Sequence, residues 1–355
     1  MPQAISYELI GQILETDIYN EQGILLLSAG KSITATDLDL LLNSNVHEVS
    51  IREPVFDNLS EEIMDEIHTV WAYNPVQAGL YKKTLSQIKQ LFLETKTGNP
   101  PNTDEITRRF SPLVEQALET PTIIHPLQSM KGKDEITFRH SINVGIFSAL
   151  IGRLLYLPDE ACLELGEAGL VHDIGKMLIP DAILNKESEL TREEEAIMRK
   201  HTQHGHTMLL RVPDLPKAYS DVALFHHERM DGSGYPFGLT RNNIPLSAQV
   251  VAVADKFDAL SSDRPYHKKL SPFKACTYLN ESQFNGRLNP EIVTPFISFV
   301  LKSYTGATVR LSTGEEGVIV LHNEQEPLRP LVKVENDVFV ELKEERDIYI
   351  EELLV

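Results

Sequence analysis

Cysteine, tryptophan and long hydrophobic runs are scarce in this 355-residue sequence. Its two cysteines, Cys162 and Cys276, exclude a disulfide-rich scaffold, and both lie in apolar, helical-looking stretches typical of buried free thiols. No stretch approaches the roughly 20 apolar residues that a membrane span requires. The N-terminus has neither the basic start nor the apolar run of a signal peptide. These absences predict a soluble protein of the cytoplasm.

Positive charge is also scarce, because 33 Lys and Arg face 52 Asp and Glu, a formal net charge of -19. This balance argues against a general nucleic-acid binder, which normally presents a basic face. It does not exclude a small phosphate ligand, since a few local cations and metal ions can hold phosphate inside an acidic protein. The rest of the composition is that of an ordinary globular chain with a sizeable core.

Turn signals and periodicity divide the chain into four predicted parts. Residues 1–55 read as a small α/β module, whose helix runs from a Thr34–Asp37 capping box to about Asn43. Helical periodicity predicts a linker or regulatory region over 56–126 and a bundle of at least six helices over 127–304. Short strands over 305–355 predict a small β-rich module. The expected fold class is therefore mainly α, with small strand-containing modules at both ends.

The bundle helices are expected over 138–155, 159–172, 191–211, 222–227, 246–261, from 271 onward, and over 290–303. Apolar residues at helical spacing, the Thr191 capping box and the Ser-Pro and Pro starts at 271 and 290 indicate these elements. Strands of the last part are expected over 308–311, 317–321, 331–334, 338–341 and 348–350.

Two short motifs carry most of the chemistry. His172-Asp173 is followed by Ile-Gly-Lys, and His226-His227 is followed by Glu-Arg-Met-Asp-Gly-Ser-Gly-Tyr-Pro. Adjacent imidazoles and carboxylates in an apolar context are costly to bury unless a cation compensates them. Further candidate ligands come from other expected helices, as in the two-metal sites of helix bundles. These are His140, His201 and Asp255.

The donor types narrow the choice of metal. Imidazole and carboxylate without thiolate favour Fe or Mn over a structural zinc, with zinc as the alternative. Asp173 can bridge two ions, and two ions can activate a water and clamp a phosphodiester. His204 and His206 share one expected helix with His201, at offsets of three and five, so we expect them to be no ligands. His140, taken alone, is read more readily as an ordinary core or surface histidine than as a ligand.

The two motifs resemble those of the HD-GYP family in the HD phosphohydrolase superfamily, over about residues 127–304. Members of that family are helical phosphodiesterases that cleave the bacterial second messenger cyclic di-GMP to pGpG or GMP, at a bi- or trinuclear centre that often holds iron. The resemblance implies that one ion is held by His140, His172, Asp173 and Asp255. It implies that the other is held by Asp173, His201, His226 and His227, with Asp173 and a water or hydroxide bridging the two.

One departure from the family pattern predicts the number of ions. Family members with a third metal carry a Glu four residues before the position of His140, where this chain has Ile136. Glu135 is adjacent, but on a helix it would point about 100° away. We therefore expect a binuclear site, with iron as the first expected metal and manganese as the next.

The resemblance also implies a substrate site beside the ions. Lys176 lies where a cation could meet a phosphate oxygen or assist the leaving group, and a solvated lysine after a helix end is the alternative reading. The loop of Gly234, Tyr235 and Pro236 is similar to the family's surface for substrate and for signalling partners, among them GGDEF-type proteins.

A second basic segment is a further candidate for the substrate. Arg264 could grip a phosphate with two hydrogen bonds. The family tends to place a lysine three residues later, where this chain has His267 and then Lys268. Arg264, and Lys268 one position after the family's lysine, are the expected substrate contacts.

Three functions compete at this point. The chain could be an active cyclic di-GMP phosphodiesterase, an HD hydrolase of another cyclic dinucleotide or phosphate ester, or a receptor or interaction protein that binds the nucleotide without turnover. The intact Gly-Tyr-Pro loop favours the first over the second, and the complete ligand set counts against the third. The sequence names no input signal for residues 1–126 and no oligomeric state, although a homodimer would fit.

Overall fold

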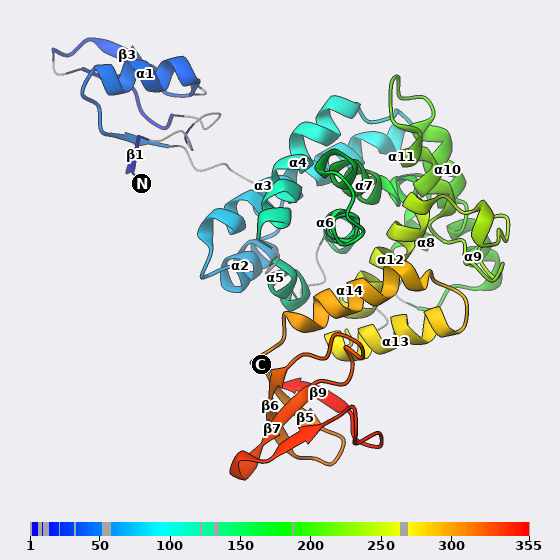
Figure 1. Cartoon of the computed structure of the whole chain (residues 1–355). Coiled ribbons are helices and arrows are strands. Elements are labelled where there is room, and N and C mark those ends of the chain that lie inside the picture. The colour runs from blue at the N-terminus through cyan, green and yellow to red at the C-terminus, as the bar shows by residue number, and fades with distance from the viewer. Residues whose placement is uncertain are drawn as a thin grey trace. The chain divides into compact units, whose positions relative to one another are not determined.

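The chain divides into two units, Met1–Asp57 and Asn58–Val355. The structure is a computed structural model that describes residues 2–5, 9, 14–20, 22–31, 33–51, 58–120, 123–130, 135–186, 188–262 and 269–354. Figure 1 shows the helices and strands of both units. Helices dominate the second unit, and short strands occur near both ends of the chain. The predicted fold class, mainly α with small strand-containing ends, is confirmed.

In the first unit, two pairs of short strands accompany one helix. β1 (Pro2–Ala4) pairs antiparallel with β4 (Glu48–Ser50), and β2 (Ile18–Tyr19) pairs antiparallel with β3 (Leu25–Leu27). Helix α1 (Ala35–Asn43) begins at the predicted capping box. The Thr34 hydroxyl accepts a hydrogen bond from the Asp37 amide, and the Asp37 carboxylate accepts one from the Thr34 amide. Leucines, isoleucines and Val49 from the helix, the strands and the segments between them form the buried core.

The second unit opens with helices α2 (Glu61–Val70), α3 (Pro75–Glu94), α4 (Thr103–Glu119) and α5 (Ile124–Ser129). The side chains of Ser60, Asn74 and Asn102 cap the first three by accepting a hydrogen bond from an amide of the first turn. Helix α3 packs on α4 and on α6 of the bundle that follows. This region therefore contacts the helices that carry the candidate ligands.

Two central helices organise the bundle. α6 (Ile136–Leu154) packs along α7 (Asp159–Val171), and α4, α11 (Lys217–Phe225) and α12 (Leu246–Ser261) surround the pair, as Figure 1 shows. Every residue of α6 from Arg139 to Gly152 is buried. A helix that is buried on all sides is apolar almost all round, so the few polar residues inside it need partners.

Part of the predicted bundle was wrong in detail. The single helix expected over 191–211 is two helices, α9 (Arg192–Met198) and α10 (His201–Leu209). The break occurs because the Lys200 amide bonds to the Ile197 carbonyl three residues back, at 3.0 Å, which tightens the chain and ends α9. Helix α11 begins at Lys217, earlier than expected, because Pro216 precedes its first turn.

The remaining helices are short α8 (Asp181–Leu184) and the pair α13 (Pro272–Phe284) and α14 (Pro290–Lys302). The last two begin at the predicted prolines, capped by Ser271 and Asn289. Among the described residues, no helix combines the length and the apolar character needed to cross a membrane.

The chain ends in an antiparallel sheet with strand order β8-β7-β6-β5-β9. Its strands are β5 (Thr308–Leu311), β6 (Glu316–Leu321), β7 (Leu331–Val334), β8 (Phe339–Glu341) and β9 (Ile350–Leu354). The last strand was expected over 348–350, and the structure has it at Ile350–Leu354, so the predicted bounds were wrong. The pairing of β5 with β9 changes register after Arg310. The hydrogen bond from the Ser312 amide to the Tyr349 carbonyl therefore lies outside the regular strand pairing. The finer predicted domain boundaries at 55, 126 and 304 stay predictions.

Candidate metal centre

Seven ligand-type side chains from separate elements converge inside the bundle. His140 lies on α6, His172 and Asp173 directly follow α7, and Asp255 lies on α12. His201 is the first residue of α10, and His226 and His227 directly follow α11. They form two groups, in each of which the ligand atoms lie within 4.8 Å of one another. The first group is His140, His172 and Asp255, and the second is Asp173, His201, His226 and His227.

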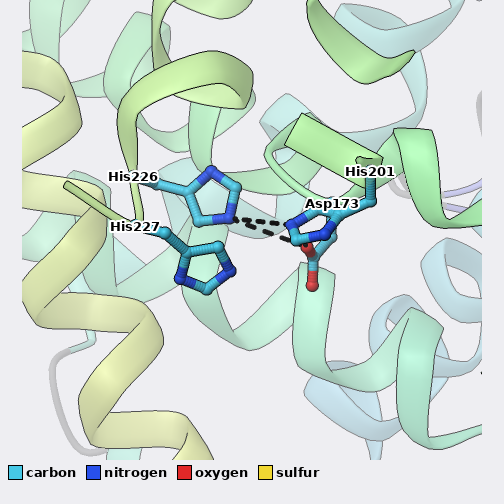
Figure 2. A group of neighbouring side chains, drawn as sticks. All are labelled: Asp173, His201, His226 and His227. Atoms are coloured by element: carbon cyan, nitrogen blue, oxygen red, sulfur yellow. Dashed lines mark hydrogen bonds and ion pairs between the residues drawn. The ribbon is translucent and has the colours of Figure 1, made fainter. Parts of the chain in front are cut away.

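The Asp173 carboxylate lies between the two groups. Its Oδ2 is 3.2 Å from His172 Nε2 and 3.6 Å from His140 Nε2. Its Oδ1 is 3.2 Å from His201 Nε2 and 3.7 Å from His226 Nε2. Figure 2 shows the rings of His201 and His226 converging on this carboxylate. One oxygen for each group is the arrangement that a bridging ligand requires.

Hydrogen bonds behind the rings fix their orientation. The Nδ1 atoms of His172, His201 and His226 lie 2.7, 2.8 and 2.9 Å from the backbone carbonyls of Gly169, Met198 and Val222. When Nδ1–H donates to a carbonyl, the Nε2 atom of the neutral ring keeps its lone pair, which can bind a metal ion. These three rings therefore present Nε2 toward Asp173.

The fourth ring of this kind is held by a carboxylate that the sequence analysis missed. His140 Nδ1 lies 2.7 Å from Asp258 Oδ2, and Asp258 Oδ1 accepts a hydrogen bond from Asn143 at 2.8 Å. Asp258 follows the candidate ligand Asp255 by three residues on α12, so both acids lie on one helix face. That spacing was the signal that could have found it.

The electrostatics of the site suit a cation. Burial alone would raise the pKa of Asp173, but His172 and Lys176 hold the pKa of this carboxyl well below its usual range. Burial lowers the pKa of both His226 and His227, and the neighbouring rings lower it further. At neutral pH the Asp173 carboxyl is ionised and these two rings are neutral, which are the protonation states that bind metal.

Unsatisfied atoms point the same way. His172 and Asp173 are 0% and 1% exposed. Among the described atoms, His172 Nε2 and Asp173 Oδ1 have no partner with hydrogen-bond geometry. Leaving such atoms buried is costly, and a bound cation would remove the cost. The residues present therefore fit the divalent ions that the motifs imply.

Close backbone packing holds the two motif segments together. The turn after Asp173 is the 3-10 helix η4 (Ile174–Leu178), which packs on α10. A Cβ placed on Gly175 would lie 2.0 Å from the His201 carbonyl oxygen and 2.4 Å from the Gly205 amide nitrogen. Only glycine allows this approach, which sets Asp173 beside His201.

The predicted cation Lys176 contacts the bridging position. Its Nζ forms a short ion pair with Asp173 Oδ2, and its side chain is 19% exposed. The ammonium therefore neutralises the central carboxylate and remains partly open to solvent.

The loop that contains Gly234–Pro236 is held in place by Glu228, an acid that the sequence analysis did not assign to the site. The buried Glu228 carboxylate accepts hydrogen bonds from the amides of Phe237 and Leu239, at 2.7 and 2.8 Å. A Cβ on Gly234 would lie 2.4 Å from the Glu228 Cα, so this position has no room for a side chain. The loop therefore folds back tightly over the motif that contains His226 and His227.

Tyr235 extends this loop to the rings of the candidate ligands. Its ring centroid is 4.6 Å from that of His227, and the guanidinium of Arg199 lies 4.8 Å from the Tyr235 centroid. Arg199 comes from the break between α9 and α10 and also pairs with Glu195 at 2.6 Å. Arg199 was not among the predicted site residues, because the break that presents it was not predicted.

The remaining candidates lie apart from the two groups or outside the description. His206 Nδ1 lies 2.9 Å from the Ser220 carbonyl, and neither His204 nor His206 belongs to either group. Arg264 and Lys268 fall within 263–268, outside the described residues. Their predicted contacts with substrate stay predictions.

Comparison with known proteins was made for sequence and for structure. Residues 123–292 match the family model described as the HD domain. A cyclic di-GMP phosphodiesterase of Pseudomonas aeruginosa is 37% identical over 255 residues, which cover 72% of this chain and 61% of that protein. A 3'3'-cGAMP-specific phosphodiesterase of Vibrio cholerae is 32% identical over 187 residues, covering 52% of this chain and 35% of that protein. The chain thus spans less than two thirds of either relative.

A solved structure shares the fold. It is an HDG"Y"P protein from Bdellovibrio bacteriovorus, with a TM-score of 0.52 and 16% identity, covering 83% of this chain and 97% of that one. Residues 123–292 therefore carry an HD domain, and its two motifs together with the relatives are consistent with the HD-GYP family.

Proposed function

We propose that this chain is a metal-dependent phosphodiesterase that hydrolyses cyclic di-GMP to pGpG, GMP or both. The observation that carries the proposal is the convergence of seven ligand-type side chains into two groups around Asp173. The name of the Pseudomonas aeruginosa relative supplies the substrate, and the shared motifs supply the reaction class.

Two ions fit the two groups. One would be held by His140, His172, Asp173 and Asp255, and the other by Asp173, His201, His226 and His227. When bound, such ions supply a water that is nucleophilic at neutral pH and neutralise charge on the phosphate oxygens. Nitrogen and oxygen donors without thiolate favour iron, then manganese.

The start of α6 supports two ions over three. Ile136, at the position where a third metal would need a carboxylate, is the first residue of α6. Helical spacing does not set the direction of Glu135, because this residue lies before the first residue of α6. It precedes α6 with a φ of 59°, and its carboxylate pairs with Lys89 Nζ at 2.6 Å. The nearest acid is therefore already neutralised by a lysine.

Residues of the chain itself would handle the phosphodiester. Lys176 is placed to exchange Asp173 for a phosphate oxygen, or to give a proton to the leaving oxygen. Tyr235, with Gly234 and Pro236, would bound the substrate on the His227 side. The same loop is the surface we propose for signalling partners such as GGDEF-type proteins, and a homodimer stays a prediction.

Two other functions are kept. The chain could hydrolyse a different cyclic dinucleotide, and the Vibrio cholerae relative is named for 3'3'-cGAMP. It could also bind nucleotide without turnover, although the two complete groups count against a degenerate site.

The test is anaerobic hydrolysis by protein loaded with iron or manganese, with cyclic di-GMP and 3'3'-cGAMP assayed in parallel. The variant His172→Ala/Asp173→Ala removes one candidate ligand and the bridge. Glu167→Gln is the matched control, because Glu167 is a buried carboxylate of α7 that binds Ser111 Oγ at 2.7 Å and lies outside both groups.

Turnover of cyclic di-GMP to pGpG or GMP, lost in the double variant and kept in the control, is expected. Preferred turnover of 3'3'-cGAMP would move the assignment to the second function. No turnover by protein that holds two ions would favour the receptor.

A further inference from the structure

One candidate ligand differs from the others in what stands behind it. His172, His201 and His226 are backed by neutral backbone carbonyls, whereas His140 is backed by the Asp258 carboxylate at 2.7 Å. A carboxylate behind a metal-bound imidazole fixes its tautomer and makes its other nitrogen a stronger donor. The two halves of the centre are therefore not equivalent.

Asp258 is itself held by a buried chain of polar groups. Its Oδ1 accepts hydrogen bonds from Asn143 Nδ2 at 2.8 Å and from Ser262 Oγ at 3.0 Å. The Tyr81 hydroxyl of α3 lies 3.4 Å from Asn143 Oδ1. Tyr81, Asn143 and Asp258 are each no more than 2% exposed. This series of hydrogen-bonded side chains thus runs from α3, which precedes the HD domain, to the candidate ligand His140.

Charge adds to this difference between the halves. The group of His140 and His172 contains Asp255, whose Oδ1 lies 3.2 Å from His140 Nε2, and Asp258 adds a second negative charge behind it. The group of His201, His226 and His227 contains Asp173, and Asp255 Oδ2 also lies 3.9 Å from His227 Nδ1, so the carboxylate that distinguishes the two sides is Asp258. A cation is attracted more strongly to the side with more negative charge in a buried setting.

We propose that Asp258 is a positioning residue that acts through His140 and makes the ion of the His140 group the more tightly bound of the two. The inference rests on the proposed two-ion centre. It does not depend on which nucleotide is hydrolysed, because binding of metal alone reports on it.

The experiment titrates Mn²⁺ into metal-free full-length protein by calorimetry. Asp258→Asn, which keeps the shape and removes the charge, is made in two backgrounds. We expect His227→Ala to retain the ion of the His140 group better, and His140→Ala to retain the other ion better. We expect Asp258→Asn to weaken Mn²⁺ binding about 10- to 100-fold in the first background and less than about threefold in the second.

Two further proteins guard against a folding defect. Glu167→Gln removes a buried carboxylate of the same bundle, which binds Thr107 Oγ1 and Ser111 Oγ, and should leave both Mn²⁺ sites unchanged. If Asp258→Asn does not fold, Asn143→Ala removes a donor to Asp258 and should weaken the same ion by a smaller factor.

Equal weakening in both backgrounds, or none in either, would overturn the role of Asp258. If the unmodified chain binds fewer than two Mn²⁺ ions, the two-ion premise fails and the inference fails with it. If the unmodified chain binds both ions but does not hydrolyse the nucleotide, the proposed function is contradicted and the inference about Asp258 still stands.

Discussion

Two buried aspartates, one in each unit, each pair with a lysine but differ in their other partners. Asp37 of the first unit binds Lys31 Nζ at 2.5 Å, and its second oxygen binds the amide and hydroxyl of Thr34 at 3.0 and 2.7 Å. Asp173 of the second unit pairs with Lys176, and its oxygens otherwise face imidazole rings from α6, α10 and the end of α11.

The comparison separates a structural acid from a ligand. The pKa of both carboxyls is lowered, so the pKa does not distinguish them. The range of their partners does. All partners of Asp37 lie within six residues and satisfy both oxygens, whereas Asp173 keeps a buried Oδ1 without hydrogen-bond geometry among the described atoms. Asp37, whose oxygens are both hydrogen-bonded by nearby residues, caps a helix. Asp173, whose ring partners come from distant parts of the chain and whose Oδ1 lacks a hydrogen bond within the described structure, is suited to bind a cation.

The largest effect is expected at Asp173. Asp173→Ala removes the carboxylate that faces both groups, so both ions should be lost. The rate of cyclic di-GMP hydrolysis should fall by more than the roughly 10³-fold cost of losing one transition-state contact. Metal content and turnover check this, with Asp37→Ala as the control that keeps both ions. Two ions retained in Asp173→Ala would contradict the bridging role.

The two lysines sharpen the comparison next. Lys176→Met should lower kcat about 100-fold and leave both ions bound, because the ammonium is proposed to serve the phosphate. Lys31→Met removes the same type of ion pair from Asp37 and should leave the rate unchanged. Steady-state kinetics with metal analysis separate the cases. Loss of ions in Lys176→Met would mean that the lysine only supports the carboxylate.

The local acid should act on stability and follow pH. Burial alone would raise the pKa of Asp37, but Lys31 and Thr34 hold it below its ordinary value of 3.8. Its contribution is therefore complete above that value and is lost as pH falls through the lowered folded pKa. Asp37→Asn should cost α1 about 1 kcal/mol of local stability at neutral pH.

This effect can be measured as hydrogen exchange of residues 35–43 in the full chain, between about pH 5 and about pH 3. In Asp37→Asn the acid-dependent loss should disappear. Asp39→Asn, an exposed acid on the same helix, is the matched control and should behave as the parent. A parent protein whose α1 becomes more protected as the pH drops would contradict the sign.

The smallest effect tests how far the long-range network reaches. Tyr81→Phe removes the hydroxyl at the α3 end of the chain to His140. Because its contact with Asn143 is long, at 3.4 Å, Mn²⁺ affinity should change by less than the roughly fivefold that a typical hydrogen bond represents. Calorimetry of Tyr81→Phe beside Asp258→Asn ranks the two positions. A larger loss of Mn²⁺ affinity in Tyr81→Phe than in Asp258→Asn would show that the contact from α3 matters more to His140 than Asp258 does.

Local sequence signals predicted many boundaries. The Thr34 cap, the Ser271-Pro272 start and the Pro290 start are short-range and were found. The break at Arg199 and Lys200 was missed, because no Gly or Pro stands there to signal a helix end, and one altered hydrogen bond leaves no mark in the sequence.

The site shows the same limit. Its seven candidate ligands were identified from two motifs, a resemblance and isolated polar residues in apolar helices, and the structure brings them together. Asp258 was missed because its partner His140 lies 118 residues away along the chain. Glu228 was missed because it binds backbone amides of the loop that follows it, and such amides carry no side-chain signal in the sequence.

The approach of Gly175 to α10 bears on how related sequences are classified. A single methyl group there would act as a wedge between η4 and the backbone of His201 and Gly205. Such a chain would keep every one of the seven ligand-type residues, yet Asp173 and His201 would be forced apart. An inventory of ligands would still count it as an active copy. The glycine, which binds nothing, is therefore as diagnostic of a working centre as the histidines are.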